Sequence, residues 1–216
     1  MASILASALA GLGAGEALAP RAMAQSPLSP EEALKELMDG NARFVEGRLT
    51  SFAHDLEILK NHTVDKQEPF AALLSCADSR VPVELIFDQS IGHLFVTRVA
   101  GNVATPEIIG SLEYGAAVLG TKVILVLGHA SCGAVKATIQ GKAVPGQISS
   151  LFPHIQPAVH VAGHDLERAI AENAKIQAAL LREASPVLAE MVKEGHLKIV
   201  AGTYDLGSGK VTLLES

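Results

Sequence analysis

The chain has 216 residues, enough to bury one hydrophobic core, and its length does not require a second domain. Its formal net charge is −6 and it contains no run of lysine or arginine, which argues against binding to nucleic acids or anionic membranes. Hydrophobic residues make up 49% of the chain and charged residues 19%, a balance typical of a folded α/β protein rather than a disordered one.

The first 25 residues differ in composition from the rest of the chain. Residues 2–15 are uncharged and rich in alanine, glycine and leucine, and Ala22-Met23-Ala24 fits a signal-peptide cleavage site before Gln25. The basic segment that normally opens a signal peptide is missing, however, and Glu16 interrupts the apolar run. We expect residues 1–25 to be a signal peptide or a disordered extension, and residues 26–216 to form a single domain. The first interpretation predicts a periplasmic or secreted protein, and the alternative is a cytoplasmic one.

The folded part is predicted to begin with a helix over residues 29–47. Ser29 at the N-cap, Pro30 at the first helical position and Glu32 three residues after the cap form a capping box. Residues 50–69 are polar and weakly periodic, which predicts a second short helix and a loop.

Three short apolar runs with the composition of β-strands follow, over residues 70–75, 93–98 and 122–128. Between the second and the third, Thr105 and Pro106 begin a predicted helix with Ile108, Leu112 and Leu119 on its apolar face. Because strands alternate with a helix and are apolar throughout, we expect a mostly parallel sheet covered by helices on both faces.

The last third of the chain is predicted to be mostly helical before it returns to β structure. The longest helical pattern covers residues 164–184, and Pro186 separates it from the next one. A strand, a turn at residues 207–209 and a final antiparallel strand close the chain. The predicted fold class is therefore α/β, with a mostly parallel central sheet, an antiparallel edge strand and flanking helices.

Both cysteines of the chain and one histidine follow predicted strands. Cys76 comes after the first strand, and His129 and Cys132 come after the third. Carboxyl ends of parallel strands meet at one edge of the sheet, and a separation of three residues at the first turn of a helix would place His129 and Cys132 on one helix face. Two thiolates and one imidazole suit zinc, and three protein ligands leave the open position of a catalytic site.

Two other interpretations of these residues belong to different classes of function. Cys132 could be the nucleophile of a thiol enzyme with His129 as its base and Asp78 as the orienting group, although Cys76 would then have no role. Alternatively, Asp78 could permanently fill the fourth zinc position of a protein that is not an enzyme.

Several segments resemble β-class carbonic anhydrases, in particular the plant-like and cyanobacterial-like members. "CADSR" begins at Cys76, "HASC" begins 53 residues later at His129, and "SCADSRVPVELIFD", "GHLFVTRVAGNV", "SLEYGAAVLG", "VLGHASCGAVKA" and "GTYDLGSGKV" are similar to family segments in family order. The resemblance implies a zinc-dependent lyase with one Zn²⁺ per chain, bound by Cys76, His129 and Cys132. It also implies reversible hydration of CO2 to bicarbonate and a proton by zinc-bound hydroxide.

The resemblance further implies roles for residues around the metal. Asp78 and Arg80 match the family's dyad, in which the arginine holds the carboxylate off the metal, and Asp78 would be a conditional fourth ligand in a closed state. Gln67, Phe95 and Tyr114 match positions that line the CO2 pocket, commonly across a dimer interface.

Assembly and substrate range also follow from the resemblance. It implies a homodimer or homotetramer in which an N-terminal helical arm embraces the partner, with CO2 and bicarbonate as small-molecule substrates and with no nucleic acid or stable membrane insertion. Relatives with the same ligands hydrolyse CS2 or COS, so these substrates stay open. Leu73 stands where relatives with a non-catalytic bicarbonate site have tryptophan, which argues against inhibition by bicarbonate at that site.

Overall fold

The computed structural model describes residues 26–51, 57 and 66–215. The predicted signal peptide lies outside these residues, as does most of the segment 50–69 in which a second short helix was expected. Domain boundaries and localisation therefore stay predictions.

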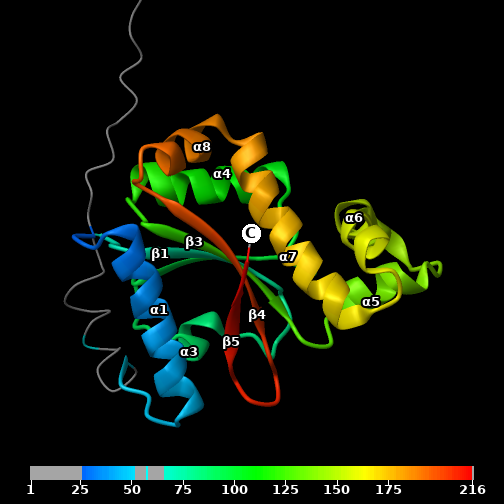
Figure 1. Cartoon of the computed structure of the whole chain (residues 1–216), viewed down its shortest axis with the longest axis horizontal. Helices are drawn as coiled ribbons and strands as arrows, with labels where there is room; N and C mark the ends of the chain where they lie inside the picture. The colour runs from blue at the N-terminus through cyan, green and yellow to red at the C-terminus, as the bar shows by residue number, and fades with distance from the viewer. Residues whose placement is uncertain (1–25, 52–56, 58–65, 216) are drawn as a thin grey trace, which may run out of the picture.

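Five strands form one sheet in the described part of the chain (Figure 1). They are β1 (Ala71–Ser75), β2 (Leu94–Arg98), β3 (Val123–His129), β4 (Lys198–Tyr204) and β5 (Val211–Leu214). The order across the sheet is β2-β1-β3-β4-β5, and only the pairing of β4 with β5 is antiparallel. This confirms the predicted fold class, including the antiparallel strand at the edge.

Helices connect the strands and cover the sheet. They are α1 (Pro30–Val45), α3 (Val83–Ile86), α4 (Pro106–Glu113), α5 (Gly133–Gln140), α6 (Phe152–Ala162), α7 (Leu166–Ala184) and α8 (Pro186–Lys193). A π-helical turn (Tyr114–Val118) continues α4, and a 3-10 helix (Gly146–Leu151) precedes α6. No helix among the described residues is both long and apolar enough to span a bilayer.

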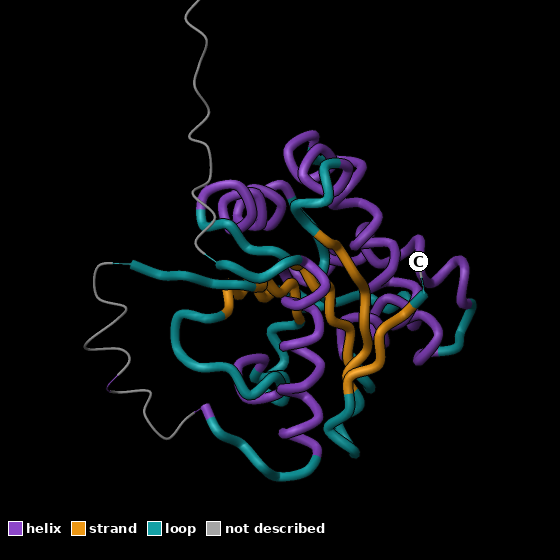
Figure 2. The backbone as a smooth tube through the Cα atoms, turned by 60° about the vertical axis from the view of Figure 1, so that its left-hand side comes forward, coloured by secondary structure: helices purple, strands orange, loops and turns teal. Residues whose placement is uncertain are grey.

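The two faces of the sheet bury two separate apolar clusters. Because side chains alternate along a strand, Leu73 of β1 packs on the side of α1 and α3, whereas Leu74 packs on the side of α4, α7 and α8. These two groups of helices lie on opposite sides of the sheet, so the sheet is the middle of three layers (Figure 1 and Figure 2). Every residue of β1 is buried, as expected for a strand with neighbours on both sides.

A third apolar cluster lies beyond the carboxyl ends of β1 and β3, where α5, α6 and α7 meet. It includes Cys76, Cys132, Ile155 and Ile170. The two cysteines are therefore part of an apolar cluster, and water is largely excluded from their sulfur atoms.

The ends of the helices agree in part with the sequence prediction. Ser29 and Glu32 form the predicted capping box at the start of α1. Thr105 stands at the N-cap of α4, but its hydroxyl donates to the carboxylate of Glu107 instead of accepting from the helix backbone. Pro186 begins α8 directly after Ser185, whose hydroxyl accepts a hydrogen bond from the Leu188 N–H. The predicted break between the two C-terminal helices is confirmed.

Candidate metal centre

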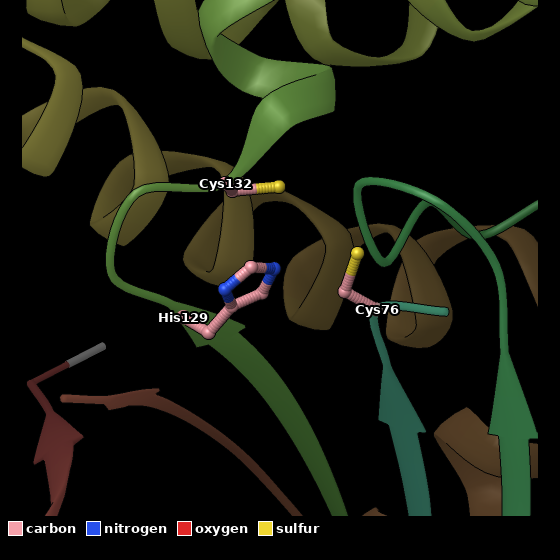
Figure 3. A group of neighbouring side chains, drawn as sticks. All are labelled: Cys76, His129 and Cys132. Atoms are coloured by element: carbon pink, nitrogen blue, oxygen red, sulfur yellow. The ribbon is translucent and has the colours of Figure 1, made fainter. Parts of the chain in front are cut away.

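Three possible metal ligands converge at the carboxyl edge of the sheet. The two sulfur atoms of Cys76 and Cys132 and a ring nitrogen of His129 all lie within 4.8 Å of one another. Figure 3 shows the two sulfurs and the imidazole directed toward one shared space. Cys76 follows β1 directly, and β1 pairs with β3 in parallel with Ser75 opposite Leu127. This register brings Cys76 and the end of β3 together despite the 53 residues between Cys76 and His129.

The expectation that His129 and Cys132 share the first turn of a helix is wrong. His129 is the last residue of β3, and Cys132 is the N-cap of α5. The two residues between them form a sharp turn in which Ser131 has a left-handed φ of 57°. Two contacts fix this turn: the Ala130 N–H donates to the Tyr204 carbonyl, and the Ser131 N–H donates to Glu167 at 3.3 Å. The reversal of the chain, and not helical spacing, turns both side chains toward Cys76.

A hydrogen bond at its other nitrogen orients the His129 ring. Its Nδ1 lies 3.0 Å from the Ala130 carbonyl oxygen, and since a carbonyl only accepts, Nδ1 carries the proton. Nε2 is buried and has no hydrogen-bond partner among the described residues. In its neutral form the imidazole therefore directs the Nε2 lone pair into the space between the sulfurs, the arrangement that a metal-binding histidine requires.

The two sulfurs have unequal affinities for a proton. Hydrogen bonding from Cys132, and to a lesser degree from His129 and the Gly101 N–H, lowers the pKa of the Cys76 thiol to about 4 despite its burial. The same contact with Cys76, followed by burial, raises the pKa of the Cys132 thiol. Burial is the largest influence on His129 and would lower the pKa of its ring, but the nearby Cys76 sulfur, the Ala130 carbonyl and the Asp78 charge together outweigh burial and raise that pKa. A thiolate is therefore present at neutral pH, ready for a cation.

The donor set fits a zinc ion. Two thiolate sulfurs and one imidazole nitrogen are ligands that zinc prefers, and three protein ligands leave a fourth tetrahedral position for water or substrate. A buried imidazole nitrogen without a partner is costly unless something binds it. A divalent cation removes that cost and allows both thiols to lose their protons.

Asp78 and Arg80 form a compact pair next to this group. Both carboxylate oxygens accept hydrogen bonds from the Arg80 guanidinium, at 2.9 and 2.8 Å, and the Arg80 backbone N–H donates to the first of them. These bonds, mainly those of the guanidinium, hold the pKa of Asp78 below its usual range. Its second oxygen lies 3.9 Å from His129 Nε2. The carboxylate is therefore ionised, directed at Arg80 and adjacent to the three ligands without joining them.

Residues that the sequence analysis did not single out support the turn after β1. The Arg98 guanidinium donates to the carbonyls of Cys76 and Asp78, and the Gly101 N–H donates to the Cys76 sulfur at 3.4 Å. Gly101 is held in turn by Asn173 of α7. One signal for these residues exists in the sequence: Asn173 and Gln177 are polar residues on the otherwise apolar face of a helix.

The three residues expected to line the CO2 pocket differ in exposure, and only two of them lie together. Phe95 of β2 and Tyr114 at the end of α4 lie together, with ring centroids 6.2 Å apart. Tyr114 is 49% exposed. Gln67 lies in the exposed loop before β1, and no described contact joins it to either ring.

Comparison with known proteins assigns the family. A family model described as carbonic anhydrase matches residues 71–211, which contain the four parallel strands of the sheet and all three possible ligands. Carbonic anhydrase of Mycolicibacterium smegmatis is 37% identical over 193 residues, covering 86% of this chain and 93% of the relative. Carbonic anhydrase 2 of Mycobacterium tuberculosis is 35% identical over the same shares of the two chains.

Solved structures agree with this assignment. The β-carbonic anhydrase CcaA superposes with a TM-score of 0.68 at 26% identity, covering 85% of this chain and 88% of that one. A structure of tetrameric β-carbonic anhydrases from Sordaria macrospora gives a TM-score of 0.65 at 20% identity, which shows a shared fold. With the parallel sheet and the cysteine, histidine and cysteine at its edge, these matches show that the chain belongs to the carbonic anhydrase family, as an enzyme of the β class.

Proposed function

We propose that the protein catalyses the zinc-dependent, reversible hydration of CO2 to bicarbonate, with Cys76, His129 and Cys132 as the zinc ligands. The observation that carries the proposal is the convergence of two sulfurs and a free imidazole nitrogen within 4.8 Å. Zinc supplies, when bound, a Lewis acid that makes water acidic enough to act as a nucleophile near neutral pH. The protein holds the three donors in place and excludes bulk water from the sulfurs.

Asp78 is proposed to orient the attacking water. Its carboxylate is ionised and lies 3.9 Å from His129 Nε2, so it can accept a hydrogen bond from a water molecule at the open position of the metal. Because the water would donate this hydrogen bond through an O–H, an oxygen lone pair would stay free to face CO2. Arg80 occupies both oxygens of Asp78 and keeps the carboxylate from taking the open position itself.

The geometry of Asp78 favours an active enzyme over a protein whose site Asp78 closes. A fourth ligand would have to leave both hydrogen bonds to Arg80, and the Arg80 guanidinium, at 52% exposed, would then lose its carboxylate partner. The closed state, in which Asp78 leaves Arg80 for the metal, stays a prediction for lower pH.

The proposal is tested by measuring zinc content and substrate turnover on the same purified sample. We expect about one zinc per chain, CO2 hydration in a stopped-flow assay, and loss of that activity after a chelator has removed the metal. Cys132→Ser should lose both metal and activity. Full activity in metal-free protein would contradict the proposal and favour a thiol mechanism. A zinc-loaded protein that turns over CS2 or COS but not CO2 would redirect it to those substrates.

Assembly as a homodimer or homotetramer is part of the proposal. Strand β2 is at an edge of the sheet, and Tyr114 and Val118 beside it are exposed to 49% and 39%. Large side chains exposed next to an unpaired edge are typical of a surface covered by another chain. Phe95 and Tyr114 would then line the substrate pocket at a boundary between subunits. Sedimentation velocity measures this directly, and a monomer at micromolar concentration would contradict it.

A further inference from the structure

A chain of buried hydrogen bonds connects the middle of α7 to the Cys76 sulfur. The Asn173 side-chain amide donates to the Gly101 carbonyl at 2.8 Å. The Gly101 N–H in turn donates to the sulfur at 3.4 Å. Asn173 is 0% exposed, so its amide has no access to solvent and depends on this contact.

Gln177, one turn further along α7, holds the other end of the same loop. Its side-chain oxygen accepts from the Ala104 N–H at 2.8 Å. Its amide nitrogen donates to the His154 carbonyl of α6 at 3.0 Å and lies 3.3 Å from the Asn173 side-chain oxygen. The two side chains therefore form one buried unit that fixes residues 101 and 104 to the helix.

The loop has little freedom to adopt another arrangement. Gly101 has a left-handed φ of 77°, and a Cβ at this position would lie 2.7 Å from Cδ1 of Ile155 and 3.2 Å from the Ala134 side chain. The following residue, Asn102, also has a positive φ, of 43°. A left-handed residue other than glycine, such as Asn102, persists only where its surroundings hold it in place, and the two amides of α7 are part of those surroundings.

We propose that Asn173 and Gln177 are positioning residues of the metal centre, which hold the Gly101 N–H on the Cys76 sulfur. This inference rests on the proposed function, because it takes Cys76 as a zinc ligand. A hydrogen bond to a thiolate withdraws electron density from the sulfur, and it also fixes the direction in which the sulfur presents its lone pairs. Neither residue touches the ligands, so their effect is transmitted through the loop.

The test compares metal binding by the full chain and by variants of α7. Asn173→Leu keeps the volume of the side chain but removes the donor to Gly101. We expect this variant to bind zinc about 10-fold more weakly in competition with a chelator, as is typical when an outer hydrogen bond to a ligand is lost. In cobalt-substituted protein, the sulfur-to-cobalt charge-transfer band should move to longer wavelength, because the sulfur has lost a hydrogen bond. Gln177→Met should change both quantities in the same direction but less.

Leu181→Ala is the matched control, since Leu181 is buried on the same helix but packs in the cluster of α4 and α8. It should lose stability and keep the zinc affinity and the cobalt spectrum. If Asn173→Leu does not fold, Asn173→Ser removes the same amide donor and keeps a small polar side chain at this position. Unchanged affinity and spectrum in the folded variants would overturn the inference, and so would equal changes in Leu181→Ala. A wild-type protein without a charge-transfer band would overturn the proposed function as well.

Discussion

Two aspartate–arginine pairs of the same chemistry occupy different places in the molecule. Asp78 and Arg80 are two residues apart, and all of their mutual hydrogen bonds lie within one turn after β1. Asp88 pairs with Arg43, which lies 45 residues earlier in the chain, and also accepts from the backbone and hydroxyl groups of Thr50 and Ser51. The first pair is local and bordered by solvent, whereas the second joins distant segments.

The two pairs differ in burial, and we infer that one supports the fold whereas the other serves the chemistry. The Asp78 side chain is 19% exposed and that of Asp88 is 0% exposed. Burial would raise the pKa of Asp88, but the hydrogen bonds from Arg43, Ser51 and Thr50 outweigh it and hold the pKa below the usual range. A buried charge with so many partners cannot be removed without cost to the fold. A carboxylate at the surface, bonded only to its own turn, can serve chemistry without supporting the fold.

The largest expected effect comes from Asp88→Asn. We expect the free energy of unfolding to fall by about 3 kcal/mol, because Arg43 loses its charged partner and the amide cannot accept all the hydrogen bonds of the carboxylate. Activity per zinc-loaded chain should stay unchanged. Urea unfolding of wild type and variant gives the first quantity, and a large loss of activity per bound zinc would contradict the separation of the two tasks.

Wild type and Asp88→Asn also show how the contribution of Asp88 to stability depends on pH. Because the pKa of Asp88 is lower in the folded chain than in the unfolded one, its contribution is fully present above the unfolded value of about 3.9 and is lost as pH falls below it. The difference in unfolding free energy between wild type and Asp88→Asn should therefore be constant between pH 8 and 6 and shrink below about pH 4. A difference that grows on acidification would have the wrong sign.

Asp78→Asn should show the opposite combination. We expect CO2 hydration to fall about 100-fold, equivalent to about 2.7 kcal/mol in the barrier, while the free energy of unfolding changes by less than about 0.5 kcal/mol. Asp39→Asn removes an exposed negative charge from α1 and serves as the control, with both quantities unchanged. If Asp78→Asn lost as much stability as Asp88→Asn, the inferred difference in role between the two pairs would be contradicted.

Substituting two glycines compares the tight packing of α1 on the residues before Asp88 with an open surface on α4. A Cβ on Gly40 of α1 would lie 1.8 Å from the Phe87 carbonyl oxygen, whereas one on Gly110 of α4 would meet nothing within 4 Å. Gly40→Ala should cost about 2 kcal/mol because a backbone atom must move. Gly110→Ala should stabilise by about 0.5–1 kcal/mol through helix propensity. Thermal unfolding of both variants measures these changes. Similar shifts in melting temperature would contradict the packing of α1 on Phe87.

Local patterns in the sequence predicted the parts of the fold that depend on local chemistry. Capping residues marked the start of α1, apolar runs marked the strands, and Pro186 marked the break before α8. The three possible ligands were also found this way, because Cys76 and His129 stand at strand ends and Cys132 follows three residues after the second of them. Ser131 shows the limit: a left-handed residue other than glycine has no clear local signal, so a turn was taken for the start of a helix.

Contacts between distant segments could not be predicted from local patterns. The hydrogen bond from Asn173 to Gly101 spans 72 residues, and that from Arg43 to Asp88 spans 45. Both depend on how helices pack on the sheet, which periodicity does not specify. The π-helical turn at residues 114–118 was not predicted either, because it departs from the regular helical period.

The order of the strands has a consequence for how the protein folds. β1 and β3 are neighbours in the sheet, although β2 and α4 lie between them in the chain. Pairing of strands so far apart requires closure of a long loop, which is slow compared with the formation of helices and hairpins. We therefore expect Cys76 to meet His129 and Cys132 only once β1 has paired with β3. A metal ion bound by this assembled group would stabilise the folded protein over the unfolded chain.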